Sequence, residues 1–186
     1  MAVEIARWQF TVADYARMRE AGILSEDDRV ELLDGEVRPL SPIGPFHAAI
    51  VNILVMLLTR QLGDRAIVSV QNPIQLNDYS EPQPDVAILQ PREDFYAGAH
   101  PGPSEILVAI EVADSSLEYD RTEKLPRYAI AGIAEVWIVD VGKRIVEQYN
   151  QPRNGRYHQM QLAEHGERIT AQTIDQLVLS VDTLFR

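Results

Sequence analysis

The stretch EILVAIEVADSSLEYDRTEKLPRYAIAGIAEVWIVD, residues 105–140, decides the fold of this chain. Residues 106–112 form an apolar run rich in β-branched side chains, which is typical of a strand buried on both faces. A helix that ends at Gly132 follows, and the apolar run GIAEVWIVD comes directly after it. The stretch therefore predicts a strand, a helix and a second strand at the centre of an α/β protein.

The first of these strands carries one carboxylate, Glu111. Burying an ionised carboxylate costs on the order of several kcal/mol unless a cation, a metal ion or hydrogen-bond donors compensate it. The predicted partner is a metal ion or Lys124, which lies on the following helix. The alternative is that Glu111 marks the frayed end of its strand and points into water, and the strand alone does not decide between the two.

The start of the helix is marked by two features. Residues 113–116 (ADSS) supply capping side chains, and Pro126 lies inside the helix, so that the regular helix begins near Thr122 or is kinked there. Lys124 is then expected close to the helix N-terminus, where a cation opposes the helix dipole. This placement indicates either a functional use of Lys124 or a salt bridge to Asp120, four residues earlier.

Length and composition predict one soluble domain spanning residues 1–186, with 46% hydrophobic and 24% charged residues. The absence of cysteine excludes disulfides, thiolate catalysis and cysteine-ligated metal sites, and it is compatible with a reducing cytosol. The first ten residues lack the features of a signal peptide. The longest apolar run, residues 48–58, is far shorter than the roughly 20 residues that a membrane span needs. We therefore expect a cytoplasmic protein that does not bind membranes.

The formal net charge of −11 limits the possible partners. A protein that coats nucleic acid or a membrane surface is usually basic, because its affinity comes from neutralising phosphates. If this chain binds DNA, it must therefore use a local basic patch, a phosphate bridged by a metal ion, or both.

The N-terminal part of the chain contains signals for a short helix, a hairpin and a long helix. The expected elements are a helix over residues 11–21 capped by Thr11, strands over 30–33 and 36–40 joined by the turn Asp34-Gly35, and a core helix over 45–62. His47, in the first turn of the long helix, could reach a phosphate or a metal-bound water. A lone histidine is, however, more often a structural or exposed residue.

The middle and the end of the chain show the period of strands. Strands are expected over residues 66–71, 73–77, 84–89, 144–150, 157–163 and 177–185, the last ending in a short turn, with a surface loop over 90–104. Asp85 directly follows Pro84, which fits the entrance of a strand because proline cannot donate to a ladder. Sites form at strand ends, but an acid at a loop boundary is also very common.

An ordered set of motifs resembles the Uma-type restriction endonuclease family of the PD-(D/E)XK superfamily. The motifs are ELLDGE at 31–36, PD at 84–85, IEV at 110–112 and YDRTEKLPRYAIAGIAEVWIVD at 119–140. The resemblance covers most of the chain and implies a restriction-endonuclease-like three-layer sandwich, with a mixed sheet between helical layers. It also implies magnesium-dependent hydrolysis of DNA phosphodiester bonds.

The resemblance also implies a set of site residues. Asp85 and Glu111 match the metal-binding catalytic acids of the superfamily, and Glu31 matches the acid from its N-terminal part. The usual lysine two residues after the second acid is replaced by Ala113, so we expect Lys124 to supply the catalytic ammonium from the next helix. Arg121 and Arg127 are predicted to contact the DNA backbone, because a planar guanidinium suits phosphate better than it suits the attacking water.

Elementary chemistry agrees with this assignment. Carboxylates that converge at strand ends repel one another and must bind a cation or hold a proton. Oxygen ligands without cysteine favour Mg²⁺ or Mn²⁺ over zinc. The alternative function is a non-catalytic module that retains the nuclease fold and binds nucleic acid or protein, which Ala113 and the acidic surface favour. Finally, the exposed edge of the meander over residues 144–163 predicts a homodimer, because such an edge needs protection.

Overall fold

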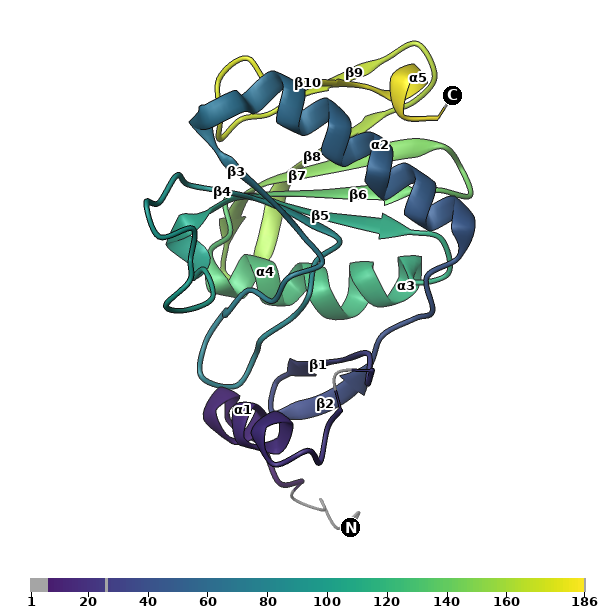
Figure 1. Cartoon of the computed structure of the whole chain (residues 1–186). Coiled ribbons are helices and arrows are strands. Elements are labelled where there is room, and N and C mark those ends of the chain that lie inside the picture. The colour runs from purple at the N-terminus through teal and green to yellow at the C-terminus, as the bar shows by residue number, and fades with distance from the viewer. Residues whose placement is uncertain (1–6, 26, 186) are drawn as a thin grey trace.

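The computed structural model describes residues 7–25 and 27–185 and arranges them around a mixed sheet of six strands (Figure 1). The helices are α1 (Val12–Glu20), α2 (Pro45–Leu62), α3 (Leu117–Tyr119), α4 (Leu125–Ala131) and α5 (Val181–Leu184). The strands are β1 (Val30–Leu33), β2 (Glu36–Pro39), β3 (Ile67–Val70), β4 (Val86–Leu89), β5 (Ile106–Ala113), β6 (Glu135–Asp140), β7 (Ile145–Arg153), β8 (Arg156–Ala163), β9 (Arg168–Thr170) and β10 (Val178–Ser180).

The large sheet has the strand order β3-β4-β5-β6-β7-β8. Strands β5 and β6 are parallel and joined by the helical segment between them, whereas the other neighbours are antiparallel. Val86 of β4 pairs with Ile110 of β5, so Asp85 and Glu111 are the next residues along the two strands. The strand, helix and strand predicted from residues 105–140 are confirmed, and their register brings the two acids to one end of the sheet.

Helices cover both faces of this sheet (Figure 1). On one face, the buried residues Ile50, Leu54 and Leu58 of α2 pack in a core with Val108 and Ile110 of β5. On the other face, Tyr128 of α4 packs in a second core with alternate residues of the same strands, among them Ala87, Ala109 and Ala113. The alternation of side chains along β5 therefore directs Glu111 to the face of the sheet that α4 covers.

Helix α2 is the central helix of the first core. With the turn that follows it, residues 45–65, it is long and apolar enough to cross a membrane by length and composition alone. In the structure its inward face is buried against the sheet. Its buried residues Ile50, Val51, Leu54, Leu58 and Leu62 face this core, and the core helix of a soluble protein can pass the same test.

In Figure 1, α1, β1 and β2 lie below α3 and α4. The cap of α1 is confirmed: Asp14 N donates to Thr11 Oγ1 at 3.1 Å, and Asp14 Oδ2 accepts from Thr11 N at 3.0 Å. The hairpin is confirmed too, with Asp34 and Gly35 both at positive φ, 49° and 77°. A Cβ atom on Gly35 would lie 2.6 Å from Gln9 Cβ, so glycine is required there for space as well as for conformation.

One expectation about local structure is wrong, and one pair of alternatives is decided. Residues 73–77 do not form a strand, because Pro73 has no N–H group and the next amides donate to loop carbonyls, as Ile74 N does to Pro82 O at 2.9 Å. For the helix after β5, the two alternatives were a start near Thr122 and a kink there, and the structure favours the second, because the helical segment begins at Leu117 and is irregular around Thr122. Asp120–Lys124 form a π-helical turn directly before α4, and Pro126 occupies the first turn of α4. The proline is accommodated by this local widening of the helix.

The C-terminal segment is tied to the sheet by a buried carboxylate. Glu135 of β6 is fully buried and accepts hydrogen bonds from Trp137 Nε1 at 2.6 Å, Gln148 Nε2 at 2.6 Å and the backbone N–H groups of Gln172 and Thr173 at 2.7 and 3.0 Å. These donors satisfy the buried charge without a metal ion. Glu135 is therefore a structural acid. Asp85 and Glu111, by contrast, lie near the other end of the sheet.

Candidate active site

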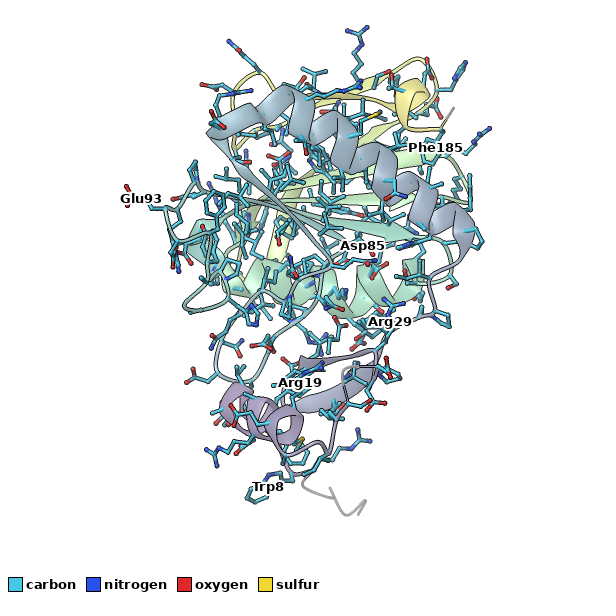
Figure 2. The ribbon with its side chains drawn as sticks, viewed as in Figure 1. Trp8, Arg19, Arg29, Asp85, Glu93 and Phe185 are labelled. Carbon is cyan, nitrogen blue, oxygen red and sulfur yellow. The ribbon has the colours of Figure 1, made fainter. Side chains whose placement is uncertain are left out.

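A pocket of about 220 Å³ lies where β4 and β5 meet the first turn of α2 and the helical segment after β5. Asp85 lies near the middle of the molecule, and Arg29 lies between it and the N-terminal hairpin (Figure 2). The lining residues are Arg29, Pro39, Leu40, Ser41, Pro42, Ile43, His47, Gln71, Gln83, Asp85, Glu111, Asp114, Ser115, Ser116, Tyr119, Asp120 and Lys124. The pocket is thus rich in charged and hydroxyl groups, as a site for phosphate chemistry would be.

Glu111 is the buried acid of this pocket, with 2% of its surface exposed. Both of its carboxylate oxygens lie 3.2 Å from Lys124 Nζ, and Tyr128 Oη donates to Oε1 at 2.5 Å. Burial raises the pKa of Glu111 well above its ordinary value, whereas the Lys124 ammonium opposes that rise. The idea that Glu111 is a frayed strand end in water is therefore wrong, and Lys124 is the partner that the sequence proposed.

Lys124 reaches this acid from the π-helical turn, and only 3% of its surface is exposed. Its ammonium also donates to Gln83 O at 3.2 Å and lies 3.3 Å from Glu31 Oε2. Burial alone would lower the pKa of Lys124, but the carboxylates of Glu111 and Glu31 outweigh it and raise this pKa above its usual value. The side chain of Ala113 has no functional group, and the ammonium is supplied to Glu111 from the helix instead.

Asp120 is not the salt-bridge partner that the helical spacing to Lys124 offered. Its Oδ2 accepts from Ser116 Oγ at 2.6 Å, and the residue lines the pocket with 3% of its surface exposed. Burial raises the pKa of Asp120, and the Lys124 ammonium partly offsets this. Sequence reasoning missed Asp120 as a pocket acid because only the π-helical turn directs both Asp120 and Lys124 inward.

Glu31 lies behind Lys124 rather than in the pocket. It projects from β1 with 1% of its surface exposed, accepts from Tyr119 Oη at 2.9 Å and from Gln83 N at 3.0 Å, and is not among the lining residues. Both carboxylate oxygens are therefore occupied by protein donors. The direct binding of a metal ion by Glu31, which the resemblance implies, stays a prediction.

Asp85 stands at the entrance of β4, as expected, and its carboxylate has three donors. His47 Nε2 lies 3.1 Å from Oδ2, Val112 N donates to Oδ2 at 2.9 Å, and Gln71 Nε2 donates to Oδ1 at 3.2 Å. Burial alone would raise the pKa of Asp85, but the hydrogen bond from His47 and the other donors lower it below its ordinary value. Asp85 is therefore held as a carboxylate.

The His47–Asp85 contact predicts a pH-dependent contribution to stability. The hydrogen bond to Asp85 raises the pKa of His47 above the ordinary value of 6.5. The contact therefore stabilises the fold fully below pH 6.5, and this contribution is lost as the pH rises through the folded pKa. We expect His47→Gln to lower the free energy of unfolding more at pH 5.5 than at pH 9 in urea titrations, and a loss that is larger at pH 9 would contradict this contact.

Arg121 and Arg127 are not brought to the pocket lining. Arg121 forms a bidentate contact with Glu147 of β7, and Arg127 Nη2 lies 2.6 Å from Asp34 Oδ2 in the hairpin turn. These pairs fasten the helical segment to the meander on one side and to the hairpin on the other. Contact of either arginine with the DNA backbone stays a prediction.

The pocket contains oxygen ligands of the kind that a hard divalent cation uses. In the part of the chain that the structure describes, no group of three or more His, Asp or Glu side chains is arranged to hold a metal ion. Mg²⁺, however, is usually bound by only one or two carboxylates and keeps several water molecules. Asp85 and Glu111 supply two carboxylates in one pocket, without any sulfur ligand, which suits such an ion.

The family of the chain follows from comparison with known proteins. The Uma2 family, described as "Putative restriction endonuclease", matches residues 12–182. The chain belongs to the Uma2 family. No curated protein matches this Uma2 sequence.

A solved structure has the same fold. The crystal structure of "a putative nuclease belonging to DUF820 from Anabaena variabilis ATCC 29413" superposes with a TM-score of 0.72 at 16% sequence identity. The match covers 95% of this chain and 97% of that chain. It confirms the α/β architecture of this Uma2 protein, a mixed sheet flanked by helices, and the family match confirms the resemblance to the Uma-type family.

Proposed function

We propose that this Uma2 protein is a magnesium-dependent endonuclease that hydrolyses DNA phosphodiester bonds in the cytoplasm, with Mn²⁺ as an alternative ion. The observation that carries the proposal is the position of the Lys124 ammonium, 3.2 Å from both oxygens of Glu111 in the pocket that contains Asp85. Burying a lysine costs free energy. This chain nevertheless buries Lys124 beside Glu111, whereas Ala113 occupies the usual position of the lysine. Such a charge is expected where negative charge develops in a transition state.

The proposed roles follow from the contacts. Asp85 and Glu111 would hold the ion, which when bound supplies Lewis-acid activation of water and neutralises phosphate charge. Lys124 would stand beside the attacking water and stabilise the negative charge that develops on the phosphoryl oxygens. Tyr128 orients Glu111 through its hydrogen bond. Glu31 and the Gln83 carbonyl keep the ammonium in place, so we assign Glu31 a positioning role.

Calorimetric titration with magnesium tests the metal-binding part of the proposal. We expect heat of binding at millimolar Mg²⁺ with a stoichiometry near one ion per chain, weakened strongly in Glu111→Gln. An isothermal titration that shows only heat of dilution would rule out the nuclease proposal. The matched control is Glu118→Gln, because Glu118 lies on the same helical segment but outside the pocket lining.

A second candidate function is a non-catalytic module that retains the fold and binds nucleic acid or protein. The observation in its favour is that Lys124, Glu111 and Glu31 satisfy one another without any metal ion. The same magnesium titration separates the two candidates, because a purely structural cluster of this kind binds no ion. Ala113 alone does not favour this module, since Lys124 supplies the missing charge.

We further propose that the protein is a homodimer paired through the edge of its meander. β8 is an edge strand of the six-stranded sheet, and Met160 and Leu162 on it are 54% and 42% exposed. Pairing of such an edge with a second copy protects it from other chains. We expect light scattering at micromolar concentration to give about twice the chain mass of 21.0 kDa. The Leu162→Lys variant should have a lower measured mass than the parent. A monomeric mass for the parent would contradict the dimer.

A further inference from the structure

The mouth of the pocket carries a cation for which the proposed chemistry has no role. Arg29 immediately precedes β1, is exposed, and lines the pocket together with Lys124. Within residues 7–25 and 27–185, no carboxylate lies within ion-pair distance of Arg29, whereas Lys124 is paired with two acids. Arg29 is thus a pocket-lining cation whose charge is not neutralised by a described carboxylate.

Neighbouring arginines differ from Arg29 in this respect. Arg38 Nη1 lies 2.6 Å from Glu123 Oε2, and Arg127 is paired with the same Glu123 and with Asp34. Their charges are cancelled locally, and neither residue lines the pocket. In a chain of net charge −11, an uncancelled cation at the rim determines where a polyanion can approach.

Arg29 is also fixed in position before any ligand arrives. Its backbone carbonyl accepts from Leu40 N at 2.8 Å, and its Nη1 donates to Ser41 O at 3.0 Å. Both partners belong to residues 39–43, the segment that forms one wall of the pocket. A guanidinium has five N–H donors in a planar fork, so most of them remain for an anion and little side-chain entropy is lost on binding.

The pocket lining also contains a nitrogen atom without a partner among the described residues. His47, in the first turn of α2, lines the pocket with 12% of its side chain exposed. Its Nε2 contacts Asp85, but its buried Nδ1 has no hydrogen-bond partner among the described residues. Buried nitrogen atoms normally have partners.

We propose that Arg29 contacts the DNA backbone at a phosphate next to the one held over Asp85 and Glu111, so that residues 39–43 form one side of the DNA-binding track. This inference rests on the proposed nuclease function. Acids at the floor repel phosphate, and a fixed guanidinium at the rim offsets that repulsion without occupying the floor. The contact supplies affinity that does not depend on base sequence.

The test is the binding of a fluorescent 20-base-pair duplex, measured by anisotropy with Ca²⁺ in place of Mg²⁺ and with the integrity of the duplex verified on a gel. The variants are Arg29→Ala, Arg29→Lys and the control Arg60→Ala, which removes the same charge near the other end of α2. We expect Arg29→Ala to weaken binding about fivefold to tenfold and to lower the salt slope, log Kd against log salt, by about 1. Arg29→Lys should restore the slope, and Arg60→Ala should match the parent.

Each other outcome overturns the inference. An unchanged Kd and slope in Arg29→Ala would show that Arg29 does not contact phosphate. A lower melting temperature with an unchanged salt slope would show that Arg29 only braces residues 39–43. A parent protein that neither binds nor cleaves the duplex would remove the proposed function and this inference together, which distinguishes that failure from the first two.

Discussion

Replacing Lys124 with alanine is expected to lower the rate of DNA cleavage by a factor of about a hundred or more, as the loss of a contact to transition-state charge does. It is also expected to destabilise the fold by about 3 to 5 kcal/mol, because breaking a buried pair leaves its partner charges uncompensated. Lys124 is 3% exposed and its ammonium lies within 3.3 Å of both Glu111 and Glu31, so both carboxylates lose their cation. Urea unfolding and single-turnover cleavage measure the two effects separately.

The two effects are separated by a matched control and by temperature. Lys143 is the other lysine of the chain and lies exposed in the turn before β7, so Lys143→Ala removes the same side chain without consequence for either quantity. Cleavage by Lys124→Ala is measured well below its own melting temperature, with circular dichroism showing that it is folded. A folded Lys124→Ala that cuts at the rate of the parent would show that Lys124 is purely structural.

Replacing Asp85 with asparagine is expected to reduce cleavage by a factor of about a thousand or more, since the Lewis-acid contribution of a metal ion amounts to several kcal/mol. The heat of magnesium binding should disappear with it. The fold should survive, because the amide oxygen of asparagine can still accept from Val112 N, as Asp85 does now at 2.9 Å. We expect a change in stability of at most about 1 kcal/mol, which reflects the lost pairing with His47.

The control for Asp85→Asn is Asp64→Asn, which removes an exposed carboxylate beyond the C-terminal end of α2. It should leave cleavage and magnesium binding unchanged. If Asp85→Asn keeps both the heat of binding and the cleavage of the parent, the ion is bound elsewhere in the chain.

Much of the fold was predictable because its signals are local. The turn Asp34-Gly35, the cap Thr11 and the apolar face of α2 each act within a few residues, and the structure confirms the elements that they predicted. The strand expected over residues 73–77 failed for a non-local reason. Its amides donate to carbonyls of Ser80, Pro82 and Pro101, which no pattern within the segment reveals.

The site was predictable in its membership but less so in its geometry. The sequence placed Lys124 at a helix start, whereas the structure buries it in a π-helical turn, because Pro126 belongs to the first turn of α4 and the widened turn precedes it. Only the tertiary fold shows that Glu31 lies behind this lysine with both oxygens occupied by Tyr119 and Gln83. The positions of Arg29 and His47 in the pocket lining likewise depend on elements that meet only in three dimensions.

The most direct test of the nuclease claim is whether the purified parent protein converts supercoiled plasmid to nicked or linear DNA in about 10 mM Mg²⁺. Millimolar Mg²⁺ is chosen so that a site with two carboxylate ligands is filled. The same reaction is run with excess EDTA and with the Asp85→Asn variant. The nuclease account predicts nicked or linear product with the parent and Mg²⁺ only. Plasmid that stays intact in all reactions, with Mg²⁺ and also with Mn²⁺, would contradict the nuclease proposal. Equal cleavage by the parent and by Asp85→Asn would contradict the proposed site.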